Sequence, residues 1–467
     1  MSEELTNEIK KRRTFAIISH PDAGKTTLTE KFLLYGGAIN TAGSVKGKAN
    51  SKYAVSDWME IEKERGISVT SSVLQFKYDD FCINILDTPG HQDFSEDTYR
   101  TLMAADSAVM VIDASKGVEA QTIKLFKVCV MRHIPIFTFI NKMDREARDS
   151  FELLDDIESV LGIRTCPVNW PIGSGKRFKG IYDRRAKTVR TFESVSTGGA
   201  KSAAETDYDI NDPALKELAT EELYDQLIDE IELLDGASDP LDLEQVQKGE
   251  LSPVFFGSAL TTFGVETFLK YFLEMTTSPL PRMSNEGEID PLTNDFSAFV
   301  FKIQANMNKA HRDRIAFLRI CSGKFQADKE VYHVQSGRKL RLSQPQQIMA
   351  QDRQVISEAY AGDVIGVFDP GLFSIGDTIT MPGSKFEYEG IPTFAPEHFA
   401  RVIQLNSMKR KQFVKGITQI AQEGAIQIFQ EYTAGMSEII VGVVGVLQFD
   451  VLKYRLENEY GCEIRLE

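Results

Sequence analysis

Short apolar runs alternate with amphipathic stretches through the first half of the chain. The apolar runs predict strands at Thr14–Ser19, Phe81–Leu86, Ala108–Ile112 and Ile136–Ile140. Between them, Thr26–Leu34 and Gln121–Met131 have helical spacing, with apolar residues recurring three and four positions apart. Strands that alternate with helices are typical of a mainly parallel sheet with helices on both faces.

The alternation breaks off between residues 150 and 250. We predict an antiparallel segment at Phe178–Phe192, a Ser/Gly/Thr-rich stretch at Ser194–Ala204, and helix in the acidic run that follows. Strand character resumes at Val254–Gly257, and helical spacing follows at Val265–Thr276. We therefore interpret 150–250 as an insert in the first domain.

A break at Ser278–Pro281 predicts a linker, because proline biases the residue before it away from the helical region. From 296 to 385, helical periodicity is almost absent and short apolar runs alternate with turns. The predicted strands are Ala298–Ile303, Ile315–Ile320, Glu330–Val334, Val355–Ala359, Val364–Phe368 and Thr378–Met381. Many short strands without helices favour a β-barrel.

The last segment predicts strands and helices in the order βαββαβ, which is the ferredoxin-like motif. These elements are His398–Leu405, Met408–Gln422, Ala425–Gln430, Glu438–Gly442, Val446–Tyr460 and Cys462–Leu466. The chain therefore predicts three domains: an α/β domain at 1–280 with an insert at about 150–250, a β-barrel at 281–390, and an α+β ferredoxin-like domain at 391–467.

Charge is distributed unevenly along the 467 residues, which carry 53 Lys+Arg and 68 Asp+Glu for a net of −15. Residues 201–250 hold 16 acidic and 3 basic residues, a net of −13, whereas 401–420 hold five basic and no acidic residues. The total charge therefore does not exclude an RNA partner. We interpret the acidic run as a solvated helical face, and the basic run fits a solvated face and an rRNA contact equally well.

Composition excludes several classes of protein. No apolar run approaches the roughly 20 residues of a membrane span, and the N-terminus has no secretory signal. The five cysteines are scattered and form no CxxC pair, which is typical of reduced thiols. We expect a cytoplasmic monomer that binds neither a membrane nor DNA.

Four motifs follow predicted strands, and the first is Ser19-His-Pro-Asp-Ala-Gly-Lys-Thr26. Gly24 lets the backbone close around a phosphate, while successive N–H groups and a helix N-terminus supply positive potential. Lys25 would reach the β- and γ-phosphates, and the Thr26 hydroxyl would bind Mg²⁺. The expected phosphate-binding residues are Ser19, His20, Pro21, Asp22, Ala23, Gly24, Lys25, Thr26 and Thr27. Because Ser19 replaces the usual first glycine, this motif alone also fits a chance strand–glycine–helix turn.

The second motif, Asp87-Thr-Pro-Gly-His91, follows the predicted strand at 81–86. Asp87 can hold Mg²⁺ through water, and the Gly90 N–H can bond a γ-phosphate. His91 is then placed to orient the attacking water. Taken alone, the Asp-Thr-Pro-Gly stretch fits an ordinary β-turn at least as well.

The third motif, Asn141-Lys-Met-Asp144, follows the strand at 136–140. The Asp144 carboxylate would accept hydrogen bonds from the N1–H and 2-amino groups of guanine, which adenine lacks in that arrangement. The Lys142 stem can cover the base, and the Asn141 side chain can tie this loop to the phosphate loop.

The fourth motif is Ser258, Ala259 and Leu260, whose backbone N–H would contact guanine O6. This tripeptide has almost no specificity alone. All four motifs, however, lie at strand ends in the order that a guanine-nucleotide switch requires. Together they predict a P-loop domain that binds GTP.

These segments resemble the translational GTPases, the family that includes elongation factors Tu and G. The resemblance rests on SHPDAGKTT (19–27), ERGISVTSS (64–72), DTPGH (87–91), VMVIDASKGVEAQT (109–122) and NKMD (141–144). Within the family, the chain is most similar to the class II release factors. That closer likeness rests on the Ser-His-Pro opening, the Arg-Gly-Ile-Ser-Val segment, HRDRIAFLRICSG (311–323) and VGVVGVLQFDVLKYRLENEY (441–460).

The resemblance implies a ribosome-stimulated GTP hydrolase that takes GTP, GDP and Mg²⁺. Ser68 matches the first switch, where its hydroxyl would join Thr26 and Asp87 (through water) around the metal. The expected catalytic residues are His91 and Lys25, with His91 drawn into place by large-subunit rRNA.

The resemblance also implies a role in translation termination, in which GTP binding and hydrolysis promote dissociation of class I release factors from the ribosome. The moving segments would be 36–72 and 87–105. The alternative is an elongation factor G-like translocation or ribosome-protection GTPase, which we disfavour because the sequence leaves no room for the further tRNA-mimicking domains. A non-catalytic GTP-binding adaptor and an ATPase are the rivals from other classes. Because the family's third domain normally runs further, we expect a shortened third domain here.

Overall fold

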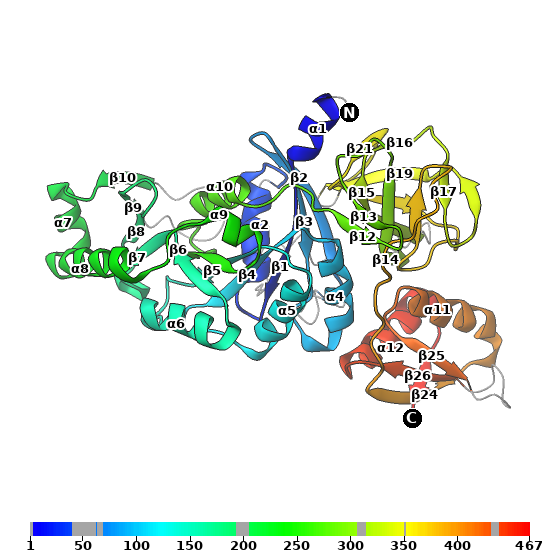
Figure 1. The fold of residues 1–467 in the computed structure, drawn as a ribbon. Coiled ribbons are helices and arrows are strands. Elements are labelled where there is room, and N and C mark those ends of the chain that lie inside the picture. The colour runs from blue at the N-terminus through cyan, green and yellow to red at the C-terminus, as the bar shows by residue number, and fades with distance from the viewer. Residues whose placement is uncertain are drawn as a thin grey trace.

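The computed structural model of the chain describes residues 3–39, 62, 69–192, 205–305, 314–349, 352–430 and 439–467. The chain forms three units that follow one another along the sequence (Figure 1). The first holds a seven-stranded sheet, the second an eight-stranded antiparallel sheet, and the third a four-stranded sheet with two helices. The predicted Ser/Gly/Thr-rich stretch at Ser194–Ala204 lies outside the described residues.

The first sheet has the strand order β2-β3-β1-β4-β5-β11-β6. Its strands are β1 (Arg12–Ser19), β2 (Ser72–Tyr78), β3 (Phe81–Asp87), β4 (Ser107–Asp113), β5 (Ile136–Asn141), β6 (Arg164–Pro167) and β11 (Leu251–Phe256). Neighbouring strands are parallel except for β2 and β3, which are antiparallel. The strands predicted from the apolar runs are thus confirmed as β1, β3, β4, β5 and β11, whereas the apolar pattern does not predict the edge strand β2.

Helices cover both faces of this sheet, and β1 shows why. Because successive side chains of a strand point to opposite faces, Phe15 and Ile17 lie in one core cluster and Ala16 and Ile18 in the other. The first cluster includes residues of α2 and α10, and the second includes residues of α4, α5 and α6. These helices are α2 (Lys25–Tyr35), α4 (Ser95–Ala104), α5 (Ala120–Met131), α6 (Ser150–Leu161) and α10 (Val265–Met275).

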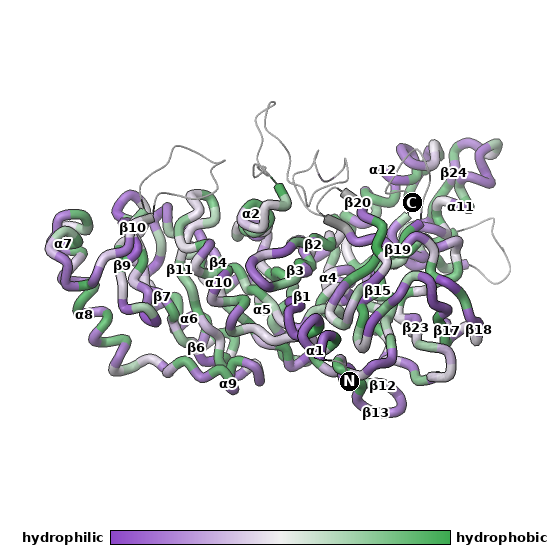
Figure 2. Tube along the Cα trace, turned by 90° about the horizontal axis from the view of Figure 1, so that it is seen from above, coloured by the Kyte–Doolittle hydropathy of each residue, from purple (hydrophilic) through white to green (hydrophobic). Residues whose placement is uncertain are grey.

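Within the predicted insert, residues 169–192 and 205–237 form a separate unit at the end of the molecule opposite the second and third domains (Figures 1 and 2). The helix α6 and the strand β6, which also fall within 150–250, belong instead to the first sheet and its covering helices. The four-stranded sheet of the separate unit has the order β10-β9-β8-β7, and the predicted antiparallel segment is confirmed as β8 and β9. The strands are β7 (Asn169–Ile172), β8 (Gly180–Asp183), β9 (Thr188–Phe192) and β10 (Glu205–Asp209). The acidic run is helical, as predicted, in α7 (Pro213–Ala219), α8 (Glu221–Ala237) and α9 (Leu243–Gln247).

The second domain contains a barrel-like antiparallel sheet of strand order β18-β17-β23-β14-β15-β22-β19-β20. Its strands are β14 (Ser297–Ala305), β15 (Arg314–Ser322), β17 (Val331–His333), β18 (Arg338–Leu340), β19 (Ser343–Met349), β20 (Asp352–Val355), β22 (Val364–Phe368) and β23 (Thr378–Thr380). Two short pairs join it: β12 (Arg282–Ser284) with β13 (Gly287–Ile289), and β16 (Lys324–Gln326) with β21 (Glu358–Tyr360). Its core is the cluster that contains Phe296, Leu318 and Ile379.

The predicted strand Val355–Ala359 is wrong, because the chain changes partners in the middle of it. β20 pairs with β19, whereas β21 pairs with β16. Between them the Ile356 N–H donates to the Pro345 carbonyl, and the Ser357 carbonyl accepts from the Ala327 N–H. Strand propensity along the chain does not reveal such a change of pairing partner.

The third domain has the predicted element order βαββαβ, and its strand order is β25-β26-β24-β27. The elements are β24 (His398–Gln404), α11 (Arg410–Gln422), β25 (Gln427–Gln430), β26 (Ile439–Val443), α12 (Leu447–Tyr460) and β27 (Ile464–Leu466). Both helices pack on one side of the sheet, where Phe413, Val441 and Leu456 share a core cluster. Predicted and observed elements differ only at their ends.

Buried polar contacts join the first domain to the second. Arg12 of β1 pairs with Asp363 at 2.9 Å, and Arg319 of β15 pairs with Asp106 at 2.5 Å. All four residues are buried. Helix α1 (Glu3–Lys10), which the sequence pattern does not predict, adds an apolar contact through Ile9 and Leu5 on the second-domain residue Ala361.

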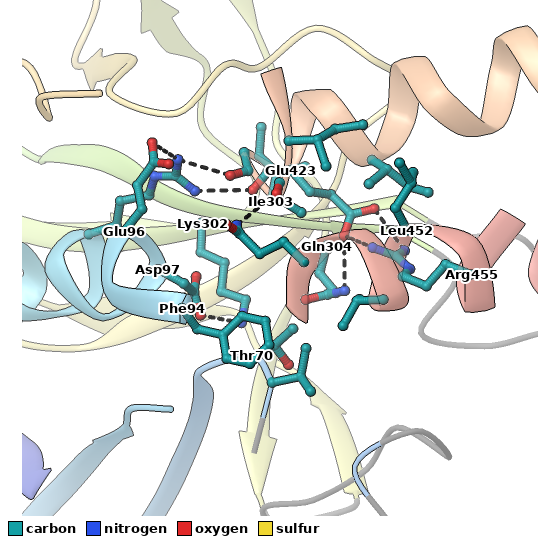
Figure 3. A pocket seen from close by; sticks show the side chains of 18 residues that line it. Thr70, Phe94, Glu96, Asp97, Lys302, Ile303, Gln304, Glu423, Leu452 and Arg455 are labelled. Atoms are coloured by element: carbon teal, nitrogen blue, oxygen red, sulfur yellow. Dashed lines mark hydrogen bonds and ion pairs between the residues drawn. The ribbon is translucent and has the colours of Figure 1, made fainter. Parts of the chain in front are cut away.

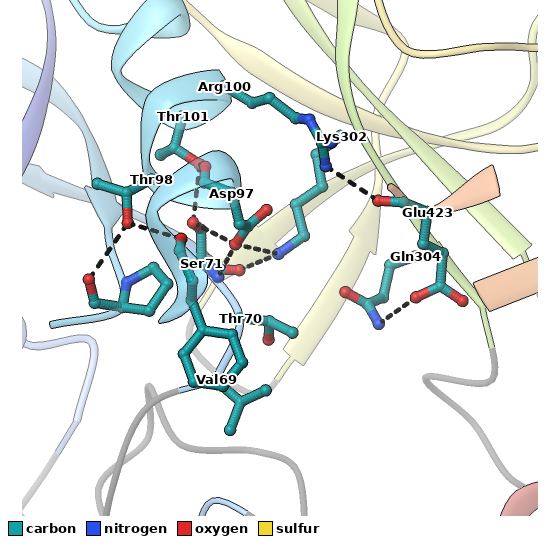
Figure 4. Close-up of polar contacts among 12 residues, drawn as sticks. Val69, Thr70, Ser71, Asp97, Thr98, Arg100, Thr101, Lys302, Gln304 and Glu423 are labelled. Carbon is teal, nitrogen blue, oxygen red and sulfur yellow. Dashed lines mark hydrogen bonds and ion pairs between the residues drawn. The ribbon is translucent and has the colours of Figure 1, made fainter. Parts of the chain in front are cut away.

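Helix α4 lies at a junction of all three domains (Figure 4). Lys302 of β14 donates to the Ser71 carbonyl and lies 4.0 Å from an Asp97 carboxylate oxygen of α4. Asp97 also accepts hydrogen bonds of 2.6 Å from the Ser71 amide and hydroxyl. From the same helix, Arg100 donates to the carbonyls of Glu423 and Gly424 in the third domain. One helix therefore contacts both other domains through charged groups.

A pocket opens at this junction, lined by side chains of all three domains (Figure 3). On its third-domain side, Arg455 holds the Glu423 carboxylate with two hydrogen bonds of 2.9 and 3.0 Å. Gln304 of β14 donates to the same carboxylate at 3.1 Å. Burial raises the pKa of Glu423, and Arg455 counteracts this shift only in part. The carboxylate thus depends on its cationic partner to remain charged in a buried place.

Within the part of the chain that the structure describes, no helix is both long and apolar enough to cross a membrane.

The Glu423–Arg455 pair predicts a local stability effect. Arg455→Met would leave Glu423 buried without its cation, so the amides of α12 should lose about 3 kcal/mol of protection in hydrogen–deuterium exchange. Arg465→Met is the matched control, because the Arg465 ion pair with Glu467 is exposed and should contribute less than about 1 kcal/mol. Equal protection of α12 in both variants would contradict this interpretation of the buried pair.

Candidate functional site

The four sequence motifs meet at one edge of the first sheet. β1, β3, β5 and β11 all run parallel, so their carboxyl ends point to the same side. Open α/β sheets bind ligands outside the carboxyl ends of their strands. The phosphate-loop motif follows β1, the Asp87 motif ends β3, the Asn141 motif follows β5, and the Ser258 motif follows β11.

The phosphate-loop motif turns sharply between β1 and α2. Gly24 has φ +98°, and a Cβ there would lie 2.2 Å from the Asn141 side-chain nitrogen. Glycine is therefore required at this position for two reasons, the backbone conformation and the space. Asp22 also has a left-handed backbone with φ +65°. Thr26 and Thr27 stand half-buried on the first turn of α2, next to its N-terminus.

Lys25 and Asp87 form a buried ion pair in the middle of the site. The Lys25 ammonium lies 2.5 Å from an Asp87 carboxylate oxygen, and the two residues are 6% and 3% exposed. The Thr29 hydroxyl donates to the same oxygen at 3.4 Å. Charges taken out of water need such partners, so this pair fixes the relative positions of α2 and β3.

The residues that follow Asp87 lie beside β1 and the phosphate loop. The Thr88 hydroxyl donates to the Ile17 carbonyl of β1 at 2.8 Å, and a Cβ on Gly90 would lie 3.5 Å from the Pro21 Cα. His91 follows, with its side chain one-third exposed and its Nδ1 accepting from the Asp93 N–H at 3.3 Å. Because Nδ1 accepts, the ring proton of the neutral imidazole is on Nε2.

Asn141 links three of the four loops. Its side-chain nitrogen donates to the Ala23 carbonyl at 2.9 Å, and its oxygen accepts from the Ala259 N–H at 2.8 Å. Asn141 is almost fully buried, at 2% exposure. The Asp144 carboxylate accepts from the Ser258 hydroxyl at 2.5 Å, so the third and fourth loops are also tied directly. Leu260 of the fourth loop is 53% exposed.

Lys142 is held by a residue that the sequence analysis does not identify. Its ammonium lies 2.6 Å from the Asp113 carboxylate at the end of β4 and 2.5 Å from the Asp22 carbonyl. Burial raises the pKa of Asp113, but the hydrogen bonds from Lys142 and Ser115 outweigh burial, so this pKa lies below its usual value. The sequence does carry a signal for this residue, because Asp113 directly follows the predicted strand Ala108–Ile112 and lies inside the family-like stretch 109–122.

Two predicted site residues stand apart from this network. Ser68, the expected third metal-site oxygen, lies outside the described residues. His20 Nε2 is 3.5 Å from the Glu119 carboxylate, and its other ring nitrogen is buried without a hydrogen-bond partner. Ser19 is buried at the end of β1. The remaining predicted residues converge on one edge of the sheet.

The oxygen atoms at this edge fit a magnesium ion. Among the described residues, no group of three or more His, Cys, Asp and Glu side chains could hold a metal. Mg²⁺ does not require such a cage, because it usually binds one or two protein oxygens together with substrate phosphates and water. The Asp87 carboxylate and the Thr26 hydroxyl are ligands of that kind.

Family models match all three domains of the chain. The elongation factor Tu GTP binding domain matches residues 10–278, elongation factor G domain 2 matches residues 295–381, and the C-terminal domain of class II release factor RF3 matches residues 388–467. The GTP-binding match alone covers more than half of the chain, and it contains all four motifs.

Relatives match the chain over nearly its whole length. Peptide chain release factor 3 of Symbiobacterium thermophilum is 60% identical over 465 residues, covering 100% of this chain and 88% of the relative. The protein of the same name in Gloeobacter violaceus is 57% identical, covering 99% and 87%. A crystal structure from Thermus thermophilus superposes with a TM-score of 0.78 at 22% identity, covering 98% of this chain and 67% of that one, and shows the likeness of fold.

The buried Lys25–Asp87 pair predicts how the stability of the first domain changes when one partner of the ion pair is replaced. Without nucleotide, Lys25→Met should lower the free energy of unfolding by about 3 kcal/mol, because Asp87 would remain buried without a cation. The double variant Lys25→Met/Asp87→Leu should recover most of that loss. Urea denaturation followed by circular dichroism measures both. A double variant that is no more stable than Lys25→Met would show that the pair is not the cause.

Proposed function

Because this chain belongs to the peptide chain release factor 3 family, the GTP hydrolases of translation termination, we propose how its residues carry out that reaction and on which partners it acts. The observation that carries the proposal is the position of Asn141. Its side chain bonds both the phosphate loop and the Ser258–Leu260 loop, so one residue holds a phosphate site and a base site in a fixed relation.

The base site would be selective for guanine. The Asp144 carboxylate would accept the N1–H and 2-amino hydrogens, and the backbone of the Ser258–Leu260 loop would donate to O6. The Ser258 hydroxyl supports this role, because it holds the Asp144 carboxylate at 2.5 Å. The Lys142 stem would cover the base, supported by the contacts of its ammonium with Asp113 and Asp22.

The phosphate site would bind the triphosphate through backbone N–H groups of residues 19–27 and through Lys25. The Lys25 ammonium would then move from Asp87 to the β- and γ-phosphates, which frees Asp87 to act through water at the metal. Thr26 and Ser68 would supply the protein oxygens for Mg²⁺, whose chemistry is to neutralise the charge that develops on the phosphate oxygens.

Hydrolysis is the in-line attack of water on the γ-phosphorus, which yields GDP and inorganic phosphate. The protonated Nε2 of His91 would orient the attacking water, while Lys25 and the Gly90 N–H would stabilise the developing charge. The Nδ1 contact with the Asp93 N–H supports this assignment, because it leaves Nε2 as the nitrogen directed at water. On the ribosome, large-subunit rRNA near the first domain would complete the arrangement.

The partners that we propose are the ribosome and the class I release factors, in the cytoplasm. Exchange of GDP for GTP would reorder 36–72 and 87–105, and the new orientation of the domains would displace the class I factor. The junction at α4 supports this coupling, because Asp97 and Arg100 connect that segment to the second and third domains. The match of the C-terminal domain at 388–467 favours termination over an elongation factor G-like role in translocation or ribosome protection.

We also propose a finer description of the architecture. The domain bounds would be 1–280, 281–390 and 391–467, with the insert at about 150–250. The second domain would be a translation-factor β-barrel and the third a ferredoxin-like domain. Support comes from the antiparallel strand order of the second domain and from the βαββαβ order of the third.

His91→Ala tests the proposed catalytic residue. Ribosome-stimulated GTP turnover should fall by about 100-fold, because a positioned proton donor or acceptor contributes at least that much. Affinity for a fluorescent GTP analogue should stay unchanged, since His91 contacts water and not the base. His133→Asn is the matched control, because His133 is exposed in the turn before β5, at the opposite edge of the sheet, and asparagine tolerates its left-handed backbone of φ +51°. Stimulated turnover that persists in His91→Ala would refute this role.

The proposed partner is tested by measuring dissociation of a labelled class I release factor from terminated ribosomes. Adding this protein with GTP should accelerate dissociation, whereas GTP alone should not. The Asp144→Asn variant should lose the effect with GTP, because the base site would no longer match guanine. If the wild-type protein does not accelerate dissociation, the class I factors are not its partners, although the GTPase activity would stand.

A further inference from the structure

Asp93 connects the proposed catalytic histidine to the third domain. Asp93 is only 7% exposed and lies in the short 3-10 helix η1 (Gln92–Phe94) that follows His91. One carboxylate oxygen lies 3.3 Å from His91 Nδ1. The other accepts a hydrogen bond of 2.8 Å from the Leu447 N–H, in the first turn of α12 and 354 positions further along the chain. The Asp93 N–H donates to the same ring nitrogen at 3.3 Å, so one residue contacts the imidazole and the third domain at the same time.

The contact with α12 has the chemistry of a helix cap. The first N–H groups of a helix have no partner within the helix, and the N-terminus carries a partial positive charge. A carboxylate placed there satisfies both requirements. In α12 that carboxylate comes from the first domain, so the cap forms only when the two domains are docked.

Gly445 shows how closely the two domains approach. A Cβ at this position would lie 2.3 Å from the Asp93 Cβ and 2.4 Å from its Cα. The backbone of Gly445 is not in the left-handed region. Glycine is therefore required here because there is no room for a side chain, and not because of the backbone conformation. Phe94 adds an apolar contact beside Asp93, in a small cluster with Val69 and Val451 of α12.

We propose that Asp93 is a positioning residue which makes the orientation of His91 depend on the docking of α12. When α12 is docked, the Leu447 N–H and the close packing of Gly445 hold Asp93 in place, and the backbone N–H of Asp93 holds Nδ1 of His91. The imidazole ring is then fixed in orientation, so Nε2 points in a single direction. When α12 moves away, Asp93 loses its cap partner and the imidazole loses its fixed neighbour. This inference rests on the proposed role of His91 and adds that the third domain controls it.

The position of the third domain would therefore act on the rate of hydrolysis and not on the affinity for GTP. The nucleotide contacts proposed above come from the loops after β1, β3, β5 and β11, and none of them involves Asp93. A displacement of about 1 Å in a reacting group can cost about 100-fold in rate. A small displacement at the α12 contact is thus expected to lower the rate of GTP hydrolysis.

Gly445→Ala tests the inference from the far side of the interface, with the full chain, saturating ribosomes and saturating GTP. The added methyl group must push Asp93 and α12 apart, so turnover should fall by about tenfold. Affinity for a fluorescent GTP analogue should match that of the wild-type protein. Gly390→Ala is the matched control, because a Cβ there meets no atom within 4 Å, and it should turn over normally.

A double variant shows whether the effect passes through His91. His91→Ala/Gly445→Ala should turn over no more slowly than His91→Ala alone. Asp93→Ala tests the contact from the first domain without adding a group: it removes the carboxylate that caps α12, so turnover should fall by about the same factor as in Gly445→Ala. These two comparisons keep the test valid if Gly445→Ala lowers the melting temperature.

Two results would overturn the inference. One is wild-type turnover of Gly445→Ala, and the other is a further loss, by the same factor, when Gly445→Ala is added to His91→Ala. The second result would mean that the third domain acts by a route that bypasses the histidine. Normal turnover of His91→Ala would instead refute the proposed role of His91, and the inference with it, which separates the two failures.

Discussion

The parallel direction of β1, β3, β4, β5 and β11 is the constraint on which the rest of the structure depends. It brings the ends of five strands to one edge of the sheet, so residues that are far apart in the sequence become neighbours. Lys25 and Asp87 meet there as a buried ion pair, and Asn141 bonds to the loops on either side of it. Lys25, Asp87, Asn141 and Asp144 are therefore each held by a group that ends or follows another strand.

Helix α4 extends this constraint to the other domains. It follows the Asp87 motif after the short helix η1, and its charged side chains Asp97 and Arg100 contact the second and third domains. Burial raises the pKa of Asp97, but Lys302 and Ser71 outweigh burial, so this pKa lies below its usual value. Charged groups that are buried between domains tolerate few alternative arrangements, because each needs its partner. The same helix therefore connects the edge of the sheet with the orientation of the domains.

Local patterns in the sequence predicted the elements but not the contacts between them. The apolar runs located β1, β3, β4 and β5, and the four motifs placed most of the site residues at strand ends. Asp113 and Asp93 were missed, because Asp113 meets Lys142, 29 positions away, only in the tertiary fold, and Asp93 lies just beyond the Asp87 motif. The strand at 355–359 was misplaced, because a change of pairing partner leaves no mark on hydrophobic alternation. Arg12 and Asp363, 351 positions apart, meet only through the tertiary fold.

The central claim is that four loops at one sheet edge form a guanine-nucleotide site with a triphosphate at the N-terminus of α2. A crystal structure with Mg²⁺ and a non-hydrolysable GTP analogue tests it most directly. The account predicts the base at the Asp144 carboxylate, the γ-phosphate within hydrogen-bonding distance of Lys25 and the Gly90 N–H, and the Asn141 bridge unchanged. A nucleotide bound elsewhere, or a base that does not contact Asp144, would contradict it.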